Sequence, residues 1–281
     1  MNTPPDLRED GRALAQIQPY AEEKHRLLMY YASLFARAIR DKWDSIVYLD
    51  LFSGPGRATI DGSNRIVATS PLLVLGLDDK FDRYIFVDAD SKNVAALKAR
   101  IAEEFRHLAT LVKKGDINQM ASEVISAMPI PGKSRKVLGF CFLDPYRMSN
   151  LRFSTIRELS QRFMDFLILI PTGMDAKRAE QYYVQSKNKT VDLFLGDDRW
   201  REKWKEEKRV AGDYGDFIVR EFTRSMNSLR FLGTHLTDTV PVRNDKNSIV
   251  YRLAFYSKDK LGIKLFKQSK KYSKLQIDLF E

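Results

Sequence analysis

The sequence is poor in the residues that build metal centres and disulfides. Its 281 residues include one cysteine, Cys141, and three histidines, His25, His107 and His235. One cysteine excludes a disulfide within the chain and cannot build a thiolate metal cluster. The histidines lie far apart and lack the short spacing of a zinc site, so they are interpreted as solvated or locally bonded side chains. No metal is expected, and a reducing cytoplasm is the expected location.

Glycine and proline are also scarce, with 14 and 10 residues, and long apolar runs are missing. The longest apolar stretches, such as residues 137–143, fall far short of the ~20 residues that span a bilayer. Because the chain opens on polar residues, no signal peptide or membrane anchor is expected. A content of 44% hydrophobic and 30% charged residues indicates an ordinary globular protein with a packed core.

Charge is abundant but uneven. There are 47 Lys and Arg against 37 Asp and Glu, a net charge of +10, and residues 258–274 alone carry seven lysines and one acid. The spacing predicts a helix with a lysine stripe on one face and Leu261, Leu265 and Phe266 turned inward. Such a stripe attracts phosphates, although a solvated face explains it as well. The stripe consists of Lys260, Lys264, Lys267, Lys271 and Lys274.

The order of elements predicts an α/β fold with a doubly wound, mostly parallel, Rossmann-like sheet. A helix is expected over residues 19–43, and apolar β-rich runs then alternate with helical periodicity. Four segments are expected: a helical segment 1–44, a cofactor-binding core 45–174, a helical insertion 175–228 that could cover a substrate or partner, and a hairpin with a basic helix, 229–281. The expected strands are 45–51, 83–87, 110–113, 137–143, 163–170, 231–242 and 248–257.

Ligands in open α/β sheets bind beyond the carboxyl ends of the strands. The first strand leads into a turn in which Gly54 and Gly56 permit close backbone approach to a ligand. A turn of this kind without a ligand is also common. The residues of this turn that we assign to cofactor binding are Asp50, Phe52, Ser53, Gly54 and Gly56.

The second strand ends at Asp88, where a nucleotide fold places an acid that accepts hydrogen bonds from ribose hydroxyls. Asp88 lies 34 residues after Gly54, but residues 57–69 form a 13-residue excursion, interpreted as a loop, whose removal leaves 21. The usual spacing of about 20 is thereby restored. Arg57 and Arg65 in this loop could contact a substrate phosphate, or the loop could simply be solvated.

The third and fourth strands are followed by further acids. Asp116 could accept from an adenine amine while Ile117 packs on the ring, and Asp116 could also cap a helix. Asp144, Pro145 and Tyr146 follow the fourth strand, an arrangement that a simple turn also explains. Together the four strand ends favour an adenosine-type cofactor. The third glycine of an NAD fingerprint is missing. S-adenosylmethionine fits better, because Asp50 can lie near the amino group of its methionine part while the glycine turn passes the ribose and Asp88 holds the ribose hydroxyls.

The runs YLDLFSGPGR, TSPL, FVDAD, GD, FLDPYR and YRLAFYSKDKLGIKLF resemble the bacterial three-Cys-motif partner family. The likeness extends from about residue 22 to 267. It implies a class I S-adenosylmethionine-dependent methyltransferase fold with a seven-stranded sheet. It also implies a possible partner, a Cys-motif protein resembling radical S-adenosylmethionine enzymes. In the family a small residue usually follows the strand-four motif, where this chain has Arg147, which we assign to nucleic-acid contacts.

The Asp144-Pro145-Tyr146 run is similar to the Asp/Asn-Pro-Pro-aromatic motif of methyltransferases that modify amines on nucleic acid bases, but lacks the second proline. The resemblance implies that the carboxylate and the Pro145 carbonyl activate the amine and that Tyr146 stacks on the extruded base. The expected function is therefore methylation of a base nitrogen in DNA or RNA. Two alternatives remain open: a scaffold that serves the Cys-motif partner, and a methyltransferase for proteins or small molecules.

Overall fold

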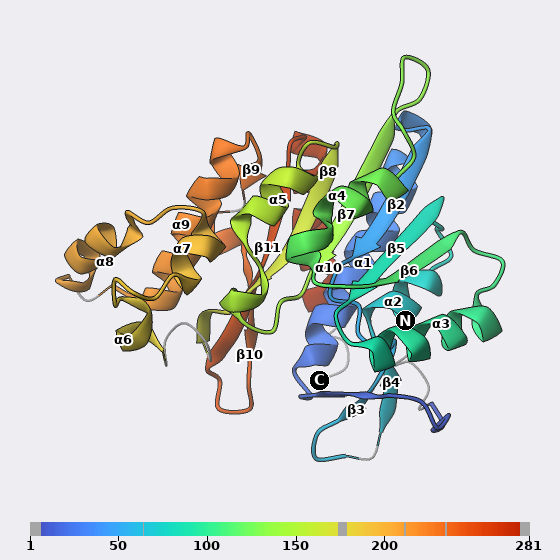
Figure 1. Cartoon of the computed structure of the whole chain (residues 1–281), viewed down its shortest axis with the longest axis horizontal. Coiled ribbons are helices and arrows are strands. Elements are labelled where there is room, and N and C mark those ends of the chain that lie inside the picture. The colour runs from blue at the N-terminus through green and yellow to red at the C-terminus, as the bar shows by residue number, and fades with distance from the viewer. Residues whose placement is uncertain (1–6, 64, 174–178, 211, 234, 276–281) are drawn as a thin grey trace. The chain divides into compact units, whose positions relative to one another are not determined.

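The computed structural model describes residues 7–63, 65–173, 179–210, 212–233 and 235–275, with side chains described through residue 270 (Figure 1). The chain forms two compact units. The first consists of Met1–Phe142 with Gln268–Glu281, and the second of Leu143–Lys267. These units divide the chain at other positions than the four segments expected from sequence character.

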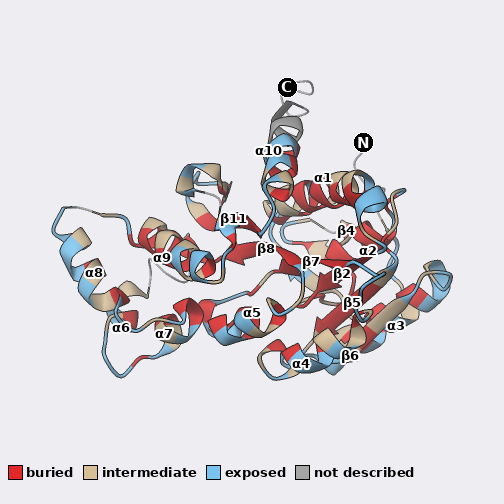
Figure 2. Cartoon of the chain, turned by 90° about the horizontal axis from the view of Figure 1, so that it is seen from above, coloured by how far each residue is buried: buried red, intermediate tan, exposed pale blue. Residues whose placement is uncertain are grey.

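A four-stranded parallel sheet forms the centre of the first unit, in the strand order β7-β2-β5-β6. Strands β2, β5 and β7 are largely apolar and almost entirely buried, which is typical of parallel strands covered on both faces, whereas the outer strand β6 buries only Val112 (Figure 2). Their bounds are β2 (Ser45–Asp50), β5 (Arg83–Asp88), β6 (Thr110–Lys114) and β7 (Val137–Leu143). The helices of this unit are α1 (Ala21–Ile39), α2 (Ser70–Leu75), α3 (Ser91–Glu104) and α4 (Ile117–Ala127).

Aromatic side chains fix α1 on one face of this sheet. Tyr48 lies opposite Phe140 in the strand register, with ring centroids 5.7 Å apart. Phe140 in turn contacts Tyr31 at 5.0 Å and Phe35 at 5.3 Å, both on α1. Because strand residues two apart share a face, this register brings the large rings to one side and buries the apolar face of α1.

Residues 57–69, expected as a loop, form a hairpin instead. Strands β3 (Arg57–Ile60) and β4 (Ile66–Ala68) pair antiparallel, and β1 (Ala15–Ile17) adds to β3 in parallel. Interpretation as a loop was wrong because both strands of the hairpin are short and one partner of β3, strand β1, comes from 43 residues earlier in the chain. The N-cap of α2 is Thr69, and Pro71 lies in the first turn of this helix, where its missing N–H costs no hydrogen bond.

The second unit contains antiparallel strands and the helices of the expected insertion. Strand β11 pairs antiparallel with β8, β9 and β10. The strand bounds are β8 (Met164–Ile170), β9 (Leu232–Gly233), β10 (Val240–Arg243) and β11 (Ile249–Ser257). The helix bounds are α5 (Phe153–Leu159), α6 (Glu180–Tyr183), α7 (Thr190–Leu195), α8 (Trp200–Lys208) and α9 (Tyr214–Ser228), and α10 (Lys260–Leu275) crosses the boundary between the units.

The expected fold class is confirmed as α/β with a mostly parallel sheet and antiparallel terminal strands, but the large sheet counts eight strands rather than seven. The additional strand arises because the expected run 231–242 is broken into β9 and β10 by a 3-10 helix, Leu236–Asp238. That turn is held by the Thr239 hydroxyl, which donates to the Leu236 carbonyl at 2.6 Å. Within the described part of the chain, no helix combines the length and apolar character that a membrane crossing requires.

Candidate cofactor site

The glycine turn after β2 is anchored at three consecutive residues. The Gly54 N–H donates to Asp88 Oδ2 at 2.8 Å, and the Pro55 carbonyl accepts from the Arg100 guanidinium at 2.6 Å. The Gly56 carbonyl accepts from the Thr69 N–H at 2.9 Å. Since hydrogen bonds hold this turn at three consecutive residues, its shape is largely set before any ligand arrives, which lowers the ordering cost of binding.

The two glycines of this turn are required for different reasons. Both have positive φ, +61° at Gly54 and +86° at Gly56, a region that other residues enter at a cost. A Cβ on Gly56 would lie 2.9 Å from Leu97 Cδ1 and 3.0 Å from Leu72 Cγ, so helices α3 and α2 close on it. A Cβ on Gly54 would meet nothing within 4 Å. Gly56 therefore serves packing, whereas Gly54 borders open space.

Asp88 lies at the end of β5 and joins three parts of the site. Besides the Gly54 N–H, its carboxylate accepts from the Asp90 N–H at 2.8 Å and from Asn93 Nδ2 at 3.1 Å. An ionised carboxylate has about four lone-pair positions. The three donors present in the described structure leave capacity for a ligand hydroxyl, as the ribose interaction requires.

Asp50 ends β2 inside the protein rather than at its surface. Its side chain is fully buried, and Oδ1 accepts from the Phe52 N–H at 3.4 Å. Burial, and secondarily the Asp50 carboxylate, raises the pKa of the Cys141 thiol well above its usual value, so that cysteine is a neutral core residue. The Ser53 hydroxyl donates to the Val87 carbonyl at 3.3 Å, which ties this turn to β5.

Asp116 and Ile117 follow β6, and the Gly115 N–H donates to the Asp88 carbonyl at 3.0 Å. The helix-cap interpretation of Asp116 is confirmed. Asp116 is the N-cap of α4, and its Oδ1 accepts a hydrogen bond from the Asn118 N–H at 2.9 Å. Asp116 is exposed, whereas Ile117 is buried, with 2% of its surface accessible. The described structure thus brings Asp50, Phe52–Gly56, Asp88 and Asp116 to the carboxyl ends of neighbouring strands β2, β5 and β6.

The predicted catalytic residues follow β7. Phe142 is the register partner of Asp50, and Asp144 comes two residues later in the chain. Pro145 is buried, whereas Tyr146 has 79% of its surface exposed. The Arg147 guanidinium lies 5.6 Å from the centre of the Tyr146 ring, within reach of a cation–π contact.

The predicted nucleic-acid contacts differ in how far their charge is already compensated. Arg57 donates to Glu104 at 2.7 Å and lies 3.3 Å from Asp10, with 13% of its side chain exposed. Arg65 reaches Glu22 at 3.4 Å. Of the lysine stripe, the exposed members in the described structure are Lys260, Lys264 and Lys267, and Lys267 pairs with Asp238 at 3.0 Å. Leu265 and Phe266 are buried as expected, whereas Leu261 is only half-buried, and the side chains of Lys271 and Lys274 lie outside the described residues.

Sequence patterns missed the residues that hold the glycine turn in place: Asn93, Arg100 and Asp10. Asn93 and Arg100 share a face of α3 with Leu97, at positions i, i+4 and i+7, so helical spacing could have identified them as one group. Asp10, which accepts from Arg100, lies 90 residues away and no local pattern indicates it.

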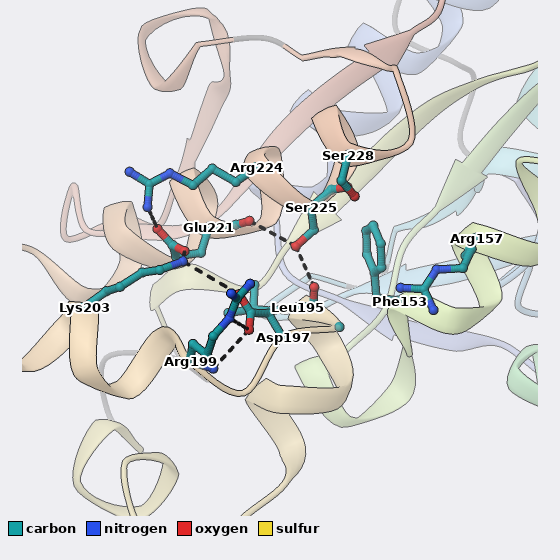
Figure 3. A pocket seen from close by; sticks show the side chains of 11 residues that line it. Phe153, Arg157, Leu195, Asp197, Arg199, Lys203, Glu221, Arg224, Ser225 and Ser228 are labelled. Carbon is teal, nitrogen blue, oxygen red and sulfur yellow. Dashed lines mark hydrogen bonds and ion pairs between the residues drawn. The ribbon is translucent and has the colours of Figure 1, made fainter.

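A cavity of about 260 Å³ lies in the second unit, lined by four basic and two acidic side chains (Figure 3). Glu221 accepts from Lys203 at 2.7 Å and also from Arg224, and Asp197 accepts from Arg199 at 3.0 Å. Within the described structure, none of the predicted cofactor or catalytic residues lines this cavity. Its remaining lining consists of Phe153, Arg157, Leu195, Gly196, Ser225 and Ser228.

Comparison with known proteins gives structural likeness only. No family model and no curated protein matches the sequence, so the resemblance to the three-Cys-motif partner family stays an expectation. An O-methyltransferase from Bacillus cereus in complex with SAH has 12% identity and a TM-score of 0.46, covering 88% of this chain and 85% of that one.

Two further solved structures are similar over most of their length. A putative O-methyltransferase from Klebsiella pneumoniae has 10% identity and a TM-score of 0.42, covering 85% of this chain and 90% of that one. An rRNA methylase from Streptococcus thermophilus has 11% identity and a TM-score of 0.41, covering 80% and 95%. With TM-scores below 0.5, none of these likenesses bears on function.

Proposed function

We propose that the chain is an S-adenosylmethionine-dependent methyltransferase that acts on a nucleic acid, at a nitrogen of a base. The observation that carries the proposal is the anchored glycine turn, whose Gly54 N–H is bonded to the same Asp88 carboxylate that retains capacity for a ligand hydroxyl. This contact joins the backbone turn directly to the acid that would bind the ribose.

The residues present fit an adenosine-type cofactor. The open space beside Gly54 permits a ligand to approach the backbone, and Asp88 would hold the ribose. Asp50 would face the amino group of the methionine part, and Asp116 the adenine amine. The bound cofactor supplies a methyl group on a positively charged sulfur, an electrophile that needs correct alignment more than covalent help from the protein.

Asp144, Pro145 and Tyr146 would then act on the base. Tyr146 offers an exposed ring on which an extruded base can stack. The Asp144 carboxylate and the Pro145 carbonyl would accept hydrogen bonds from the exocyclic amine, so that its lone pair becomes available. The cofactor would supply the methyl group, and Asp144 or water would take up the proton that the amine loses. The exposed lysines of α10 would contact the phosphate backbone.

Cofactor binding is tested first, by titration calorimetry with S-adenosylhomocysteine (SAH), which is S-adenosylmethionine without its transferable methyl group. We expect saturable binding at one site, weakened by Asp88→Ala. An exposed aspartate, Asp198, provides the matched control variant, Asp198→Ala, which should bind as the unmodified chain does. If the unmodified chain does not bind SAH, the methyltransferase proposal fails, and a scaffold role beside a Cys-motif partner protein becomes the better explanation.

The reaction is tested with S-adenosylmethionine labelled in its methyl group and separate DNA, RNA and protein fractions. We expect label in a nucleic acid fraction, and loss of transfer in Asp144→Ala with SAH affinity retained. Undiminished transfer by this variant would remove Asp144 from the mechanism. Label confined to protein would contradict the nucleic acid substrate while leaving the methyltransferase activity in place.

A further inference from the structure

The Arg100 side chain is the hub of a buried ionic network in the first unit. It has no exposed surface, although an isolated charge is costly to bury. Its guanidinium donates two hydrogen bonds to the Asp10 carboxylate, from Nε at 2.8 Å and from Nη2 at 2.7 Å. The remaining nitrogen, Nη1, donates to the Ala13 carbonyl at 3.0 Å and to the Pro55 carbonyl at 2.6 Å. One side chain therefore joins helix α3, the N-terminal segment and the glycine turn.

The bond to Pro55 controls the direction of the next peptide group. A trans peptide is planar, so its C=O and N–H point in opposite directions. Holding the Pro55 carbonyl toward Arg100 therefore turns the Gly56 N–H away from α3. On the same helix Asn93 fixes Asp88, and Leu97 limits the space at Gly56. One face of α3 thus supports both ends of the turn.

The N-terminal segment, residues 7–17, is held at several points and forms a strap. Leu7 pairs with Ile66, and β1 at Ala15–Ile17 pairs with β3. Between these two attachments Asp10 carries the ionic contact to Arg100. The Arg100 guanidinium holds the pKa of the Asp10 carboxyl well below its usual range, so the carboxylate stays charged at neutral pH.

We propose that Arg100 is a positioning residue for cofactor binding, and that through its contacts to Asp10 and Pro55 it couples docking of the N-terminal strap to the shape of the glycine turn. The inference rests on the proposed function, since it assigns the turn to the cofactor. Coupling between two sites is reciprocal. A docked strap therefore favours cofactor binding, and a bound cofactor holds the strap in place.

The test combines SAH affinity with amide hydrogen exchange in three variants. Arg100→Lys keeps the charge but loses the planar fork that reaches Asp10 and Pro55 together, and Asp10→Asn keeps the shape but removes the carboxylate charge. The matched control is Glu103→Gln on α3, which breaks the ion pair between Glu103 and Arg12 of the strap and leaves Asp10, Arg100 and the turn unchanged. We expect SAH affinity to fall about tenfold in the first two variants, the effect of ~1.4 kcal/mol, and to stay unchanged in the control.

Hydrogen exchange separates positioning from a merely structural role. In the unmodified chain SAH should slow exchange in residues 7–17, and this protection should be lost in Arg100→Lys. Unchanged SAH affinity in both variants, or an equal loss in Glu103→Gln, would overturn the proposal. If the unmodified chain binds no SAH, the proposed function fails separately. The coupling is then tested by amide exchange in residues 54–57 of the free protein. Faster exchange in Arg100→Lys than in the unmodified chain supports the coupling, and unchanged exchange refutes it.

Discussion

Gly54 and Gly56 are two residues apart in the same turn, yet their replacement by alanine should have different consequences for stability and for ligand binding. Both residues have positive φ, so each alanine incurs a backbone cost of about 1–2 kcal/mol. The gain from a stiffer unfolded chain is similar for both variants and cancels in the comparison. The difference between them therefore reports what surrounds each Cβ.

At Gly56 the new Cβ would lie 2.9 Å from Leu97 Cδ1 and 3.0 Å from Leu72 Cγ, whereas at Gly54 nothing lies within 4 Å. Forcing a methyl group into a packed site costs about 1–3 kcal/mol. We therefore expect Gly56→Ala to lose about 2–5 kcal/mol of unfolding free energy in the first unit, and Gly54→Ala about 1–2 kcal/mol. Because the space beside Gly54 is where the ligand would approach, Gly54→Ala should weaken SAH binding more than its small stability loss explains.

Unfolding of the first unit is measured by urea titration, with amide exchange in peptides from β2 and β5 as the readout. Peptides from β8 and β11 provide an internal reference in the second unit. SAH affinity is measured by calorimetry on both variants. Equal stability losses would show that Leu97 and Leu72 yield without cost, and unchanged SAH affinity in Gly54→Ala would refute placement of the ligand beside this residue.

Two further predictions concern pH and salt. Burial lowers the pKa of His25 to about 3 from 6.5, so the unfolded state binds the proton more readily; stability is complete above pH 6.5 and declines as pH falls toward 3. Between pH 6.5 and 5 the free energy of unfolding should fall by about 2 kcal/mol. This fall should be absent in His25→Gln and retained in the exposed control His107→Gln. A pH profile of His25→Gln identical to that of the unmodified chain would contradict the prediction. Replacing Lys260 and Lys264 by Gln should reduce the slope of log binding constant for nucleic acid against log salt concentration by about 0.7–0.9 per lysine. The same reduction in a control with Lys92 and Lys98 on α3 replaced by Gln would show that the lysines act only through general charge attraction.

The central strands were predictable because burial on both faces leaves a strong local pattern. The run 137–143 was expected as a strand and is β7, with every residue buried. The excursion 57–69 was not predictable as a hairpin, since β3 has four residues and β4 three, and β3 also pairs with β1 from 43 residues earlier. Strands this short carry too little local pattern, and a distant partner adds hydrogen bonds that no local pattern indicates.

The acids that end the strands were also accessible from sequence, because chain connectivity puts them at one edge of a parallel sheet. What supports them was not. Arg100 is a charged residue within an amphipathic helix, a position normally interpreted as solvent-exposed, yet it is fully buried. Its partner Asp10 is 90 residues away in the chain.

The sequence by itself determined which residues end the buried strands, because apolar runs and turn residues act locally. Only the tertiary structure decided that the strap of residues 7–17 reaches the glycine turn, that Asp88 joins the turn to α3, and that Gly56 is enclosed while Gly54 borders open space. The physical reason is that a buried charge and a close-packed methyl position are defined by neighbours brought together in folding, and such neighbours leave no periodic trace in the chain.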